Sequence, residues 1–145
     1  GIMGAIQDGV LDHGGSAIGV MPNMLNEKEI TSQKLTELIL VDSMHERKNK
    51  MAELADAFVM APGGAGSLEE FFEMYSWSQI GIHQKPIAIF NINGFFNPLQ
   101  SLLSHMIEEG FIDAKYDTLA PLCDTTEALF ETINNYKPLG VRTYD

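Results

Sequence analysis

A glycine-rich segment, Pro62-Gly63-Gly64-Ala65-Gly66-Ser67, has the composition of a loop that binds an anion. Glycine lets the backbone approach a ligand closely and adopt conformations that other residues avoid. The segment follows a short apolar run and precedes an amphipathic run, so it is predicted to join a strand to a helix. The first amide groups of a helix lack partners within the helix and carry partial positive charge, which favours a bound anion such as phosphate.

Two common phosphate-binding motifs do not fit this segment. A P-loop would place a lysine directly before Ser67, so the sequence does not support ATP hydrolysis. A dinucleotide-binding fingerprint would place a third glycine where Glu69 stands. A tight strand-to-helix turn without a ligand is the structural alternative, and composition alone leaves it open.

Arg47 is a cation in an unfavourable position for a helix. Ser43 and Glu46 have the spacing of a capping box, with Ser43 as the N-cap and Glu46 reaching back to it. Arg47 therefore falls near the start of the predicted helix, where an exposed positive charge opposes the helix dipole by ~0.3–1 kcal/mol. It also interrupts the apolar stripe of Met44 and Met51. Its planar guanidinium suits a phosphate, ribose or carboxylate, and the alternative is a side chain that extends past the methionines to solvent.

Glu70 has two interpretations. Ser67-Leu68-Glu69-Glu70 is a second capping-box sequence, so Glu70 can simply close a helix end, and spacing alone favours this interpretation. A carboxylate one turn from a phosphate loop is nonetheless placed to reach the sugar of a bound nucleotide.

The elements that must position these residues alternate between short apolar strands and amphipathic helices. Helices are predicted over residues 3–12, 43–55, 68–80, 97–109 and 126–134, and strands over 17–21, 38–41, 57–61, 86–90 and 119–123. This alternation is typical of an α/β fold with a Rossmann-like parallel sheet and helices on both faces. Ligands of such sheets bind beyond the carboxyl ends of the strands, where the glycine-rich segment falls. With no linker or repeat, residues 1–145 are predicted to form a single nucleotide-binding domain.

Composition limits the partners and cofactors. Nine basic and 20 acidic residues give a net charge of −11, which disfavours nucleic acid as a partner. The single cysteine, Cys123, excludes an internal disulfide framework and a cysteine-based zinc site, and it suits a reduced thiol in a cytoplasmic protein. The four histidines lack zinc-ligand spacing, so no metal is predicted. No apolar run approaches the ~18 residues of a membrane span, so no membrane association is expected.

Ser43-Met44-His45-Glu46-Arg47-Lys48, followed by Pro62 to Glu70, resembles the Lonely Guy (LOG) family of cytokinin riboside 5′-monophosphate phosphoribohydrolases, which are often mislabelled lysine decarboxylases. The family motifs are M-H-x-R-K and P-G-G-x-G-T-x-x-E, and the resemblance extends from Gly1 to about Asn134. It implies hydrolysis of the N-glycosidic bond of a (prenyl)adenosine 5′-monophosphate to free base plus ribose 5-phosphate, without a cofactor. Ser67 replaces the family's usual threonine and keeps its hydroxyl.

The resemblance also implies roles for individual residues. Arg47 and Glu70 fall on the family's catalytic pair. An ionised Glu70 would stabilise the oxocarbenium-like sugar and orient water, by analogy with glycoside hydrolysis, while Arg47 would position phosphate or ribose. The substrate-binding positions fall on Glu29, Met44, Arg47, Lys48, Gly63, Gly64, Ala65, Gly66, Ser67, Leu68, Glu69, Glu70 and Ser76.

Three further expectations concern the whole protein. Family members begin with a strand–helix–strand unit that the chain lacks before Gly1, so a longer protein is expected. The resemblance, together with the aromatic residues at 71, 72, 75 and 77, predicts a homodimer or larger homo-oligomer. The alternative function is a non-hydrolytic nucleotide-binding or carrier protein of the same fold. Pyridoxal chemistry is not supported, because no cofactor-lysine motif is present.

Overall fold

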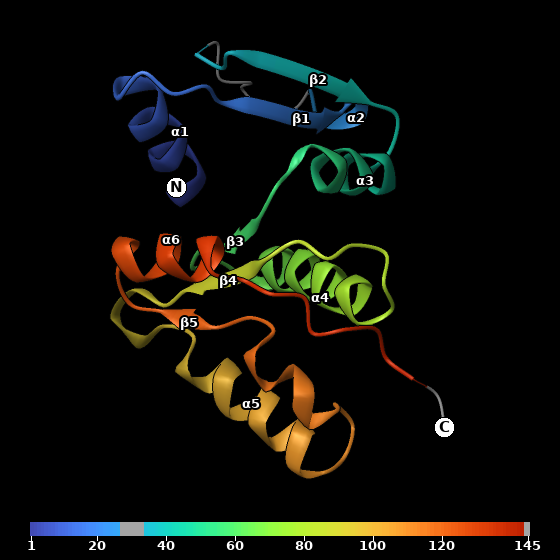
Figure 1. Cartoon of the computed structure of the whole chain (residues 1–145). Helices are drawn as coiled ribbons and strands as arrows, with labels where there is room; N and C mark the ends of the chain where they lie inside the picture. The colour runs from blue at the N-terminus through green and yellow to red at the C-terminus, as the bar shows by residue number, and fades with distance from the viewer. Residues whose placement is uncertain (27–33, 144–145) are drawn as a thin grey trace. The chain divides into compact units, whose positions relative to one another are not determined.

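The computed structural model describes residues 1–26 and 34–143, which fall into two compact units: residues 1–55, and a second that begins at residue 56 (Figure 1). Each unit combines helices with parallel strands. The predicted α/β class with Rossmann-like parallel pairing is therefore confirmed. That residues 1–145 make a single domain stays a prediction.

The first unit carries two parallel strands and the helix of the candidate arginine. Helix α1 (Ile2–Asp12) precedes β1 (Ile18–Pro22), and α2 (Asn23–Asn26) follows β1 directly. Strand β2 (Glu37–Val41) pairs in parallel with β1, and α3 (Met44–Leu54) packs against both strands. The carboxyl end of β2 thus leads straight into the N-terminus of α3.

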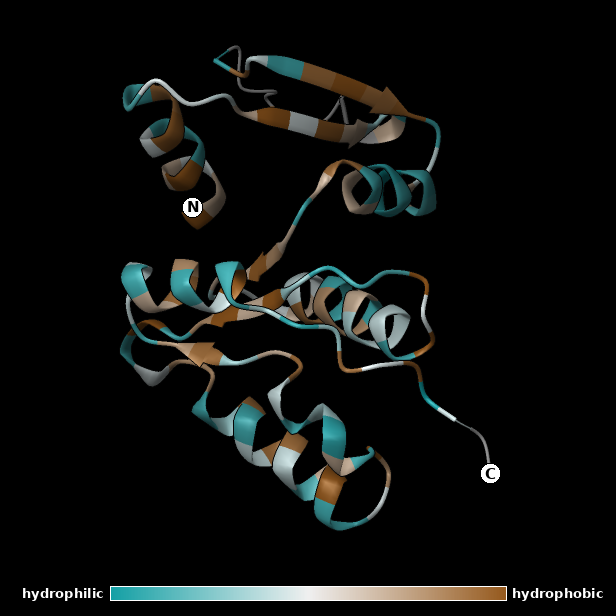
Figure 2. Ribbon diagram, in the orientation of Figure 1, coloured by the Kyte–Doolittle hydropathy of each residue, from teal (hydrophilic) through white to brown (hydrophobic). Residues whose placement is uncertain are grey.

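Burial in the first unit is sparse. Among its described residues only Val20 and Pro22, both on β1, are buried. Ile18 on β1 and Leu40 on β2 are half exposed, at 50% and 47%. Both strands are nonetheless largely hydrophobic along their length (Figure 2). The apolar pattern that predicts these strands therefore marks buried positions only along part of β1.

The second unit holds the glycine-rich segment beside a three-stranded parallel sheet of order β3-β4-β5. Its strands are β3 (Phe58–Met60), β4 (Ile87–Phe90) and β5 (Leu122–Cys123). Strand β4 lies between the other two and is the most buried, and its residues 87–89 are at most 2% exposed. Because parallel strands need crossover connections, every strand pair here is joined through a helical segment.

The helices of the second unit connect these strands. Helix α4 (Ala65–Gln79) joins β3 to β4 and packs against β3. The connection from β4 to β5 contains η1 (Ile92–Gly94), α5 (Asn97–Glu108) and η2 (Ala114–Thr118). Helix α6 (Thr126–Asn134) packs on β4 and β5, where Leu129 closes a cluster with Ala88 and Cys123.

Three element predictions differ from the structure. The helix predicted from residue 68 begins at Ala65, because Gly64 takes the N-cap position and the next two residues are already helical. The strand predicted over 119–123 is only Leu122–Cys123, since Pro121 has no N–H to donate to a ladder. The sequence pattern predicts none of the short helices α2, η1 and η2.

The segment after α6 is tied to the far end of α4. Tyr116, 2% exposed, donates its hydroxyl toward the carbonyl oxygens of Gly140 at 3.1 Å and Gln79 at 3.4 Å. The backbone N–H of Arg142 donates to the same Gln79 carbonyl at 2.7 Å. The two bonds to Gln79 satisfy a carbonyl group that the end of α4 leaves without an intrahelical partner.

Replacing Tyr116 with phenylalanine should lower the free energy of unfolding by about 1–2 kcal/mol, because it removes a buried hydroxyl and the hydrogen bond that this hydroxyl donates to the Gly140 carbonyl, while the Gln79 carbonyl keeps the N–H of Arg142. Urea unfolding measures the change. Ser101→Ala is the control, since it removes an exposed hydroxyl that bonds within α5 and should cost less than about 0.5 kcal/mol. Equal losses in the two variants would show that the tail does not stabilise the second unit.

Candidate active site

The N-terminus of α4 has the features of an anion site. Strand β3 ends at Met60, and four residues later Gly64 becomes the N-cap of α4 without any side-chain hydrogen bond to the helix. Helices α3 and α6 are capped by the side chains of Ser43 and Thr125, whereas α1 and α5, like α4, have no side-chain cap. The first intrahelical bond of α4 runs from the N–H of Leu68 to the carbonyl of Gly64 at 3.2 Å. The amides of residues 65–67 therefore have no partner within the helix and point along its axis toward a ligand position.

The glycines of this segment differ in how much space surrounds each of them. A Cβ at Gly63 would overlap the hydroxyl of Ser67, so packing within the loop requires glycine there. A Cβ at Gly64 or Gly66 would meet no atom within 4 Å. Gly64 has φ −102°, which any residue adopts, so the backbone conformation does not require glycine at this position. The open space needed for close approach of a ligand is present at both positions.

Glu70 does not close the helix end. Because α4 begins at Ala65, Ser67 lies inside the first turn and is not an N-cap, so the capping-box interpretation of residues 67–70 is wrong. Glu70 is half-buried and follows Ser67 by three residues, which places both on neighbouring positions of one helix face. The alternative that competed with a catalytic role is removed, and the catalytic role itself stays a prediction.

The other binding candidates on α4 divide into two groups. Ala65, Gly66, Leu68 and Glu69 all lie in the first two turns, beside the glycine-rich loop. Ser76 is exposed and follows Ser67 by nine residues, which is two and a half turns and roughly 14 Å along the axis. Within α4, therefore, Ser76 lies on the side opposite Ser67, and its part in substrate binding stays a prediction.

Arg47 is anchored rather than extended into solvent. Ser43 caps α3 as predicted, since its hydroxyl accepts from the N–H of Glu46 at 3.1 Å. The Glu46 carboxylate reaches back to the N–H of Asp42 at 2.8 Å, one residue before the predicted target. The part-buried Nε of Arg47 donates to the carbonyl of Val20 in β1 at 2.9 Å. This bond fixes the guanidinium at the start of α3.

Two of the remaining candidates of the first unit lie on α3. Met44 is the first residue of α3, and Lys48 is half-buried one turn further on. Glu29 lies outside the described residues. Arg47 belongs to the first unit and Glu70 to the second, and their meeting in one site stays a prediction.

The described residues contain neither a cluster of metal ligands nor a membrane-spanning helix. Across residues 1–26 and 34–143, no group of three or more His, Cys, Asp or Glu side chains is arranged to hold a metal ion. None of the helices in the described part of the chain is long and apolar enough to cross a membrane.

Fold and loop together define an α/β protein with parallel strands and an uncapped, glycine-lined helix N-terminus, the arrangement with which such folds bind phosphate groups. The family model described as "Possible lysine decarboxylase" matches residues 3–133. The chain belongs to this family.

Curated relatives identify the branch of the family. The chain is 40% identical over 138 residues to the probable cytokinin riboside 5′-monophosphate phosphoribohydrolase LOGL2 of Oryza sativa subsp. japonica, covering 95% of this chain and 57% of the relative. It is 38% identical over 138 residues to the cytokinin riboside 5′-monophosphate phosphoribohydrolase LOG4 of Arabidopsis thaliana, covering 95% and 64%. The resemblance to the Lonely Guy family is confirmed. The chain spans about three-fifths of the length of these relatives.

Proposed function

We propose that the protein hydrolyses the N-glycosidic bond of a nucleoside 5′-monophosphate, an adenosine 5′-monophosphate with or without a prenyl group, to free base and ribose 5-phosphate. The observation that carries the proposal is the uncapped N-terminus of α4, with open space at Gly64 and Gly66 and with Glu70 one turn beyond Ser67. The names of the relatives, which specify a cytokinin riboside 5′-monophosphate, support this substrate class.

The phosphate group binds at the loop. Its oxygens accept hydrogen bonds from the free amides at the start of α4, and the hydroxyl of Ser67 adds a further donor. Because the amides belong to the backbone, a chain of net charge −11 can hold an anion here without a basic patch. The phosphate is remote from the bond that breaks, so its binding energy serves to orient the sugar.

Glu70 acts on the sugar. One helical turn separates it from Ser67, so a sugar attached to the bound phosphate lies beside its carboxylate. As the bond from C1′ to the base nitrogen breaks, C1′ becomes oxocarbenium-like, and a negative charge at Glu70 stabilises it. Glu70 also accepts a hydrogen bond from the water that attacks C1′. The water oxygen bonds to C1′ and passes one proton to the Glu70 carboxylate, while the bond from C1′ to the base breaks and the base gains one proton on its nitrogen. Water thus supplies overall both the new hydroxyl of ribose 5-phosphate and the proton of the free base.

Arg47 positions the substrate. Its Nε is engaged by the Val20 carbonyl, so the N–H groups at the tip of the guanidinium form the ligand-binding part of the fork. In this proposal they bind phosphate or ribose and keep Glu70 ionised. No metal or cofactor takes part.

Incubation of the protein with AMP, and in parallel with isopentenyl-AMP, tests the function directly. We expect release of free adenine or isopentenyladenine together with ribose 5-phosphate, detected by chromatography. A preference for one of the two substrates shows whether the natural base is prenylated. Tight binding of both nucleotides without base release would instead establish the alternative, a nucleotide-binding or carrier protein of the same fold.

The proposal includes a cytoplasmic homodimer or larger homo-oligomer. The single cysteine, Cys123, is a free and buried thiol, which suits this location. Phe71 and Tyr75 are each only 4% exposed in the single chain, so these two aromatic side chains give less support to a shared surface than the sequence suggests. The resemblance to the LOG family supports the oligomer.

A further inference from the structure

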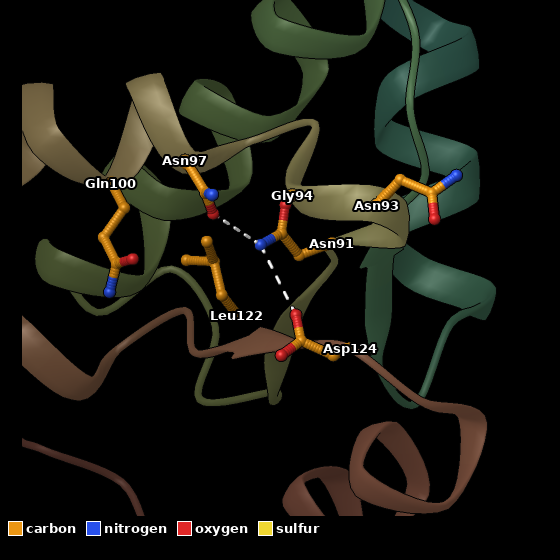
Figure 3. A pocket seen from close by; sticks show the side chains of 7 residues that line it. All are labelled: Asn91, Asn93, Gly94, Asn97, Gln100, Leu122 and Asp124. Atoms are coloured by element: carbon orange, nitrogen blue, oxygen red, sulfur yellow. Dashed lines mark hydrogen bonds between the residues drawn. The ribbon is translucent and has the colours of Figure 1, made fainter.

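A cavity lies in the second unit, at the carboxyl ends of β4 and β5. It has a volume of about 530 Å³. Asn91, directly after β4, and Asp124, directly after β5, contribute to its wall (Figure 3). Asn97 and Gln100 from the first turn of α5 line it as well. None of these four side chains belongs to the glycine-rich loop or to the proposed catalytic residues.

A buried carboxamide organises this cavity. Asn91 is 5% exposed, and its Oδ1 accepts the backbone N–H of Phe96 at 2.7 Å. Its Nδ2 donates to Oδ1 of Asn97 at 2.9 Å and lies 3.5 Å from Oδ1 of Asp124 (Figure 3). Asn91 thus holds the side chains of Asn97, at the start of α5, and Asp124, after β5, at the wall of the same cavity. Both polar atoms of this carboxamide are hydrogen-bonded, and such a satisfied network keeps its members in fixed positions.

The turn before α5 keeps Asn97 in place. Asn93 and Gly94 both have left-handed backbone conformations, with φ of 54° and 70°. A Cβ at Gly94 would lie 2.7 Å from Nδ2 of Asn97, so glycine is needed there for conformation and for space. The backbone therefore leaves the amide of Asn97 at the cavity wall.

The chemistry of the wall differs from that of the glycine-rich loop. Asp124 is the only charged side chain among the residues that line the cavity, so a phosphate would be repelled. A carboxylate accepts two hydrogen bonds from neighbouring hydroxyls, and carboxamides both donate and accept. Leu122 adds an apolar surface for C–H groups. We propose that this cavity binds the hydroxyl groups of a neutral sugar or sugar moiety, with Asp124 accepting from a pair of hydroxyls and Asn97 and Gln100 completing the contacts.

The cavity shares a sheet edge with the loop but is a separate site. Met60 of β3 lies opposite Ile89 of β4, which lies opposite Leu122 of β5, so all three strands end at one edge. Two strand spacings, roughly 10 Å, separate β3 from β5. The inference does not depend on the proposed hydrolysis, because it concerns different side chains and a ligand without charge.

NMR titration of the isotope-labelled protein with D-ribose tests the proposal. We expect saturable shifts of the side-chain NH2 signals of Asn97 and Gln100, and none of the backbone amides of residues 65–67. Inorganic phosphate should give the reverse pattern. Asp124→Ala should weaken ribose binding at least tenfold, since a hydrogen bond to a charged group is lost. Glu131→Gln, an exposed acid on α6, should leave the affinity unchanged.

Three outcomes overturn the proposal: no saturable ribose-dependent shift at the cavity, unchanged ribose affinity in Asp124→Ala, or shifts there with phosphate and not with ribose. The spectrum of each variant reports its folding at the same time. Gln100→Ala serves as a second variant. Because Gln100 is exposed at the rim of the cavity, this substitution should weaken ribose binding without altering the fold.

Discussion

Replacing Glu70 with glutamine should lower the rate of base release from AMP by ~10²–10³-fold, while melting temperature and AMP affinity stay near those of the wild type. The exchange preserves shape and removes only the negative charge that the developing positive charge on the sugar requires. Because α4 begins at Ala65, Glu70 has no capping function whose loss would complicate the result. Turnover and calorimetric AMP binding, measured on the same preparation, separate chemistry from affinity.

Glu73→Gln is the matched control, since it makes the same exchange one turn further along α4 and should leave turnover unchanged. Arg47→Ala should abolish turnover and weaken AMP binding as well, because it removes a ligand contact. The two losses should not add in the double variant if the residues act together. A Glu70→Gln protein that keeps more than about a tenth of wild-type turnover would contradict the catalytic role of this carboxylate.

Gly66→Ala should change stability and binding in opposite directions. Gly66 lies in the first turn of α4, and a Cβ there meets no protein atom within 4 Å, so alanine should stabilise the helix by about 0.5–1 kcal/mol. The added Cβ tilts toward the helix N-terminus, into the space where phosphate approaches the free amides. Loss of one or two charge-assisted hydrogen bonds there corresponds to a loss of AMP affinity of ~10²-fold or more.

Thermal unfolding and calorimetry measure both effects of Gly66→Ala. Gly63→Ala provides the contrast, because its Cβ would overlap the Ser67 hydroxyl and the loop must shift, which should lower stability. If Gly66→Ala binds AMP as tightly as the wild type, the phosphate does not bind at the start of α4.

Local sequence signals account for most of the fold. The Ser43 cap, the start of α6 after Thr125, and the apolar run of β4 follow from side-chain types that act on their own neighbours. The sequence pattern places the start of α4 three residues late, because a glycine-rich run is typical of a turn although the second half of this run is helical. That error changed the interpretation of Glu70, since it placed an N-cap at Ser67.

The candidate site was predictable in part. The glycine-rich segment and Arg47 were recognisable from the sequence because each departs from what an ordinary loop or helix would contain. The bond from Arg47 to Val20 was not, since it joins residues 27 positions apart through a backbone carbonyl that carries no sequence signal. The polar cavity was missed as well. Asn91 and Asp124 each follow a buried strand directly, and this position beyond the strand ends is the signal that could have indicated it.

The central position of β4 also sets the order in which the second unit can form. Its partners β3 and β5 lie 29 and 33 residues away in register, so neither pairing forms before a long loop has closed. Ala88 is covered only when Cys123 and Leu129 are in place. During synthesis the glycine-rich loop therefore emerges more than fifty residues before the sheet that supports it is complete. We expect nascent chains that end before α6 to expose β4 and to depend on chaperones.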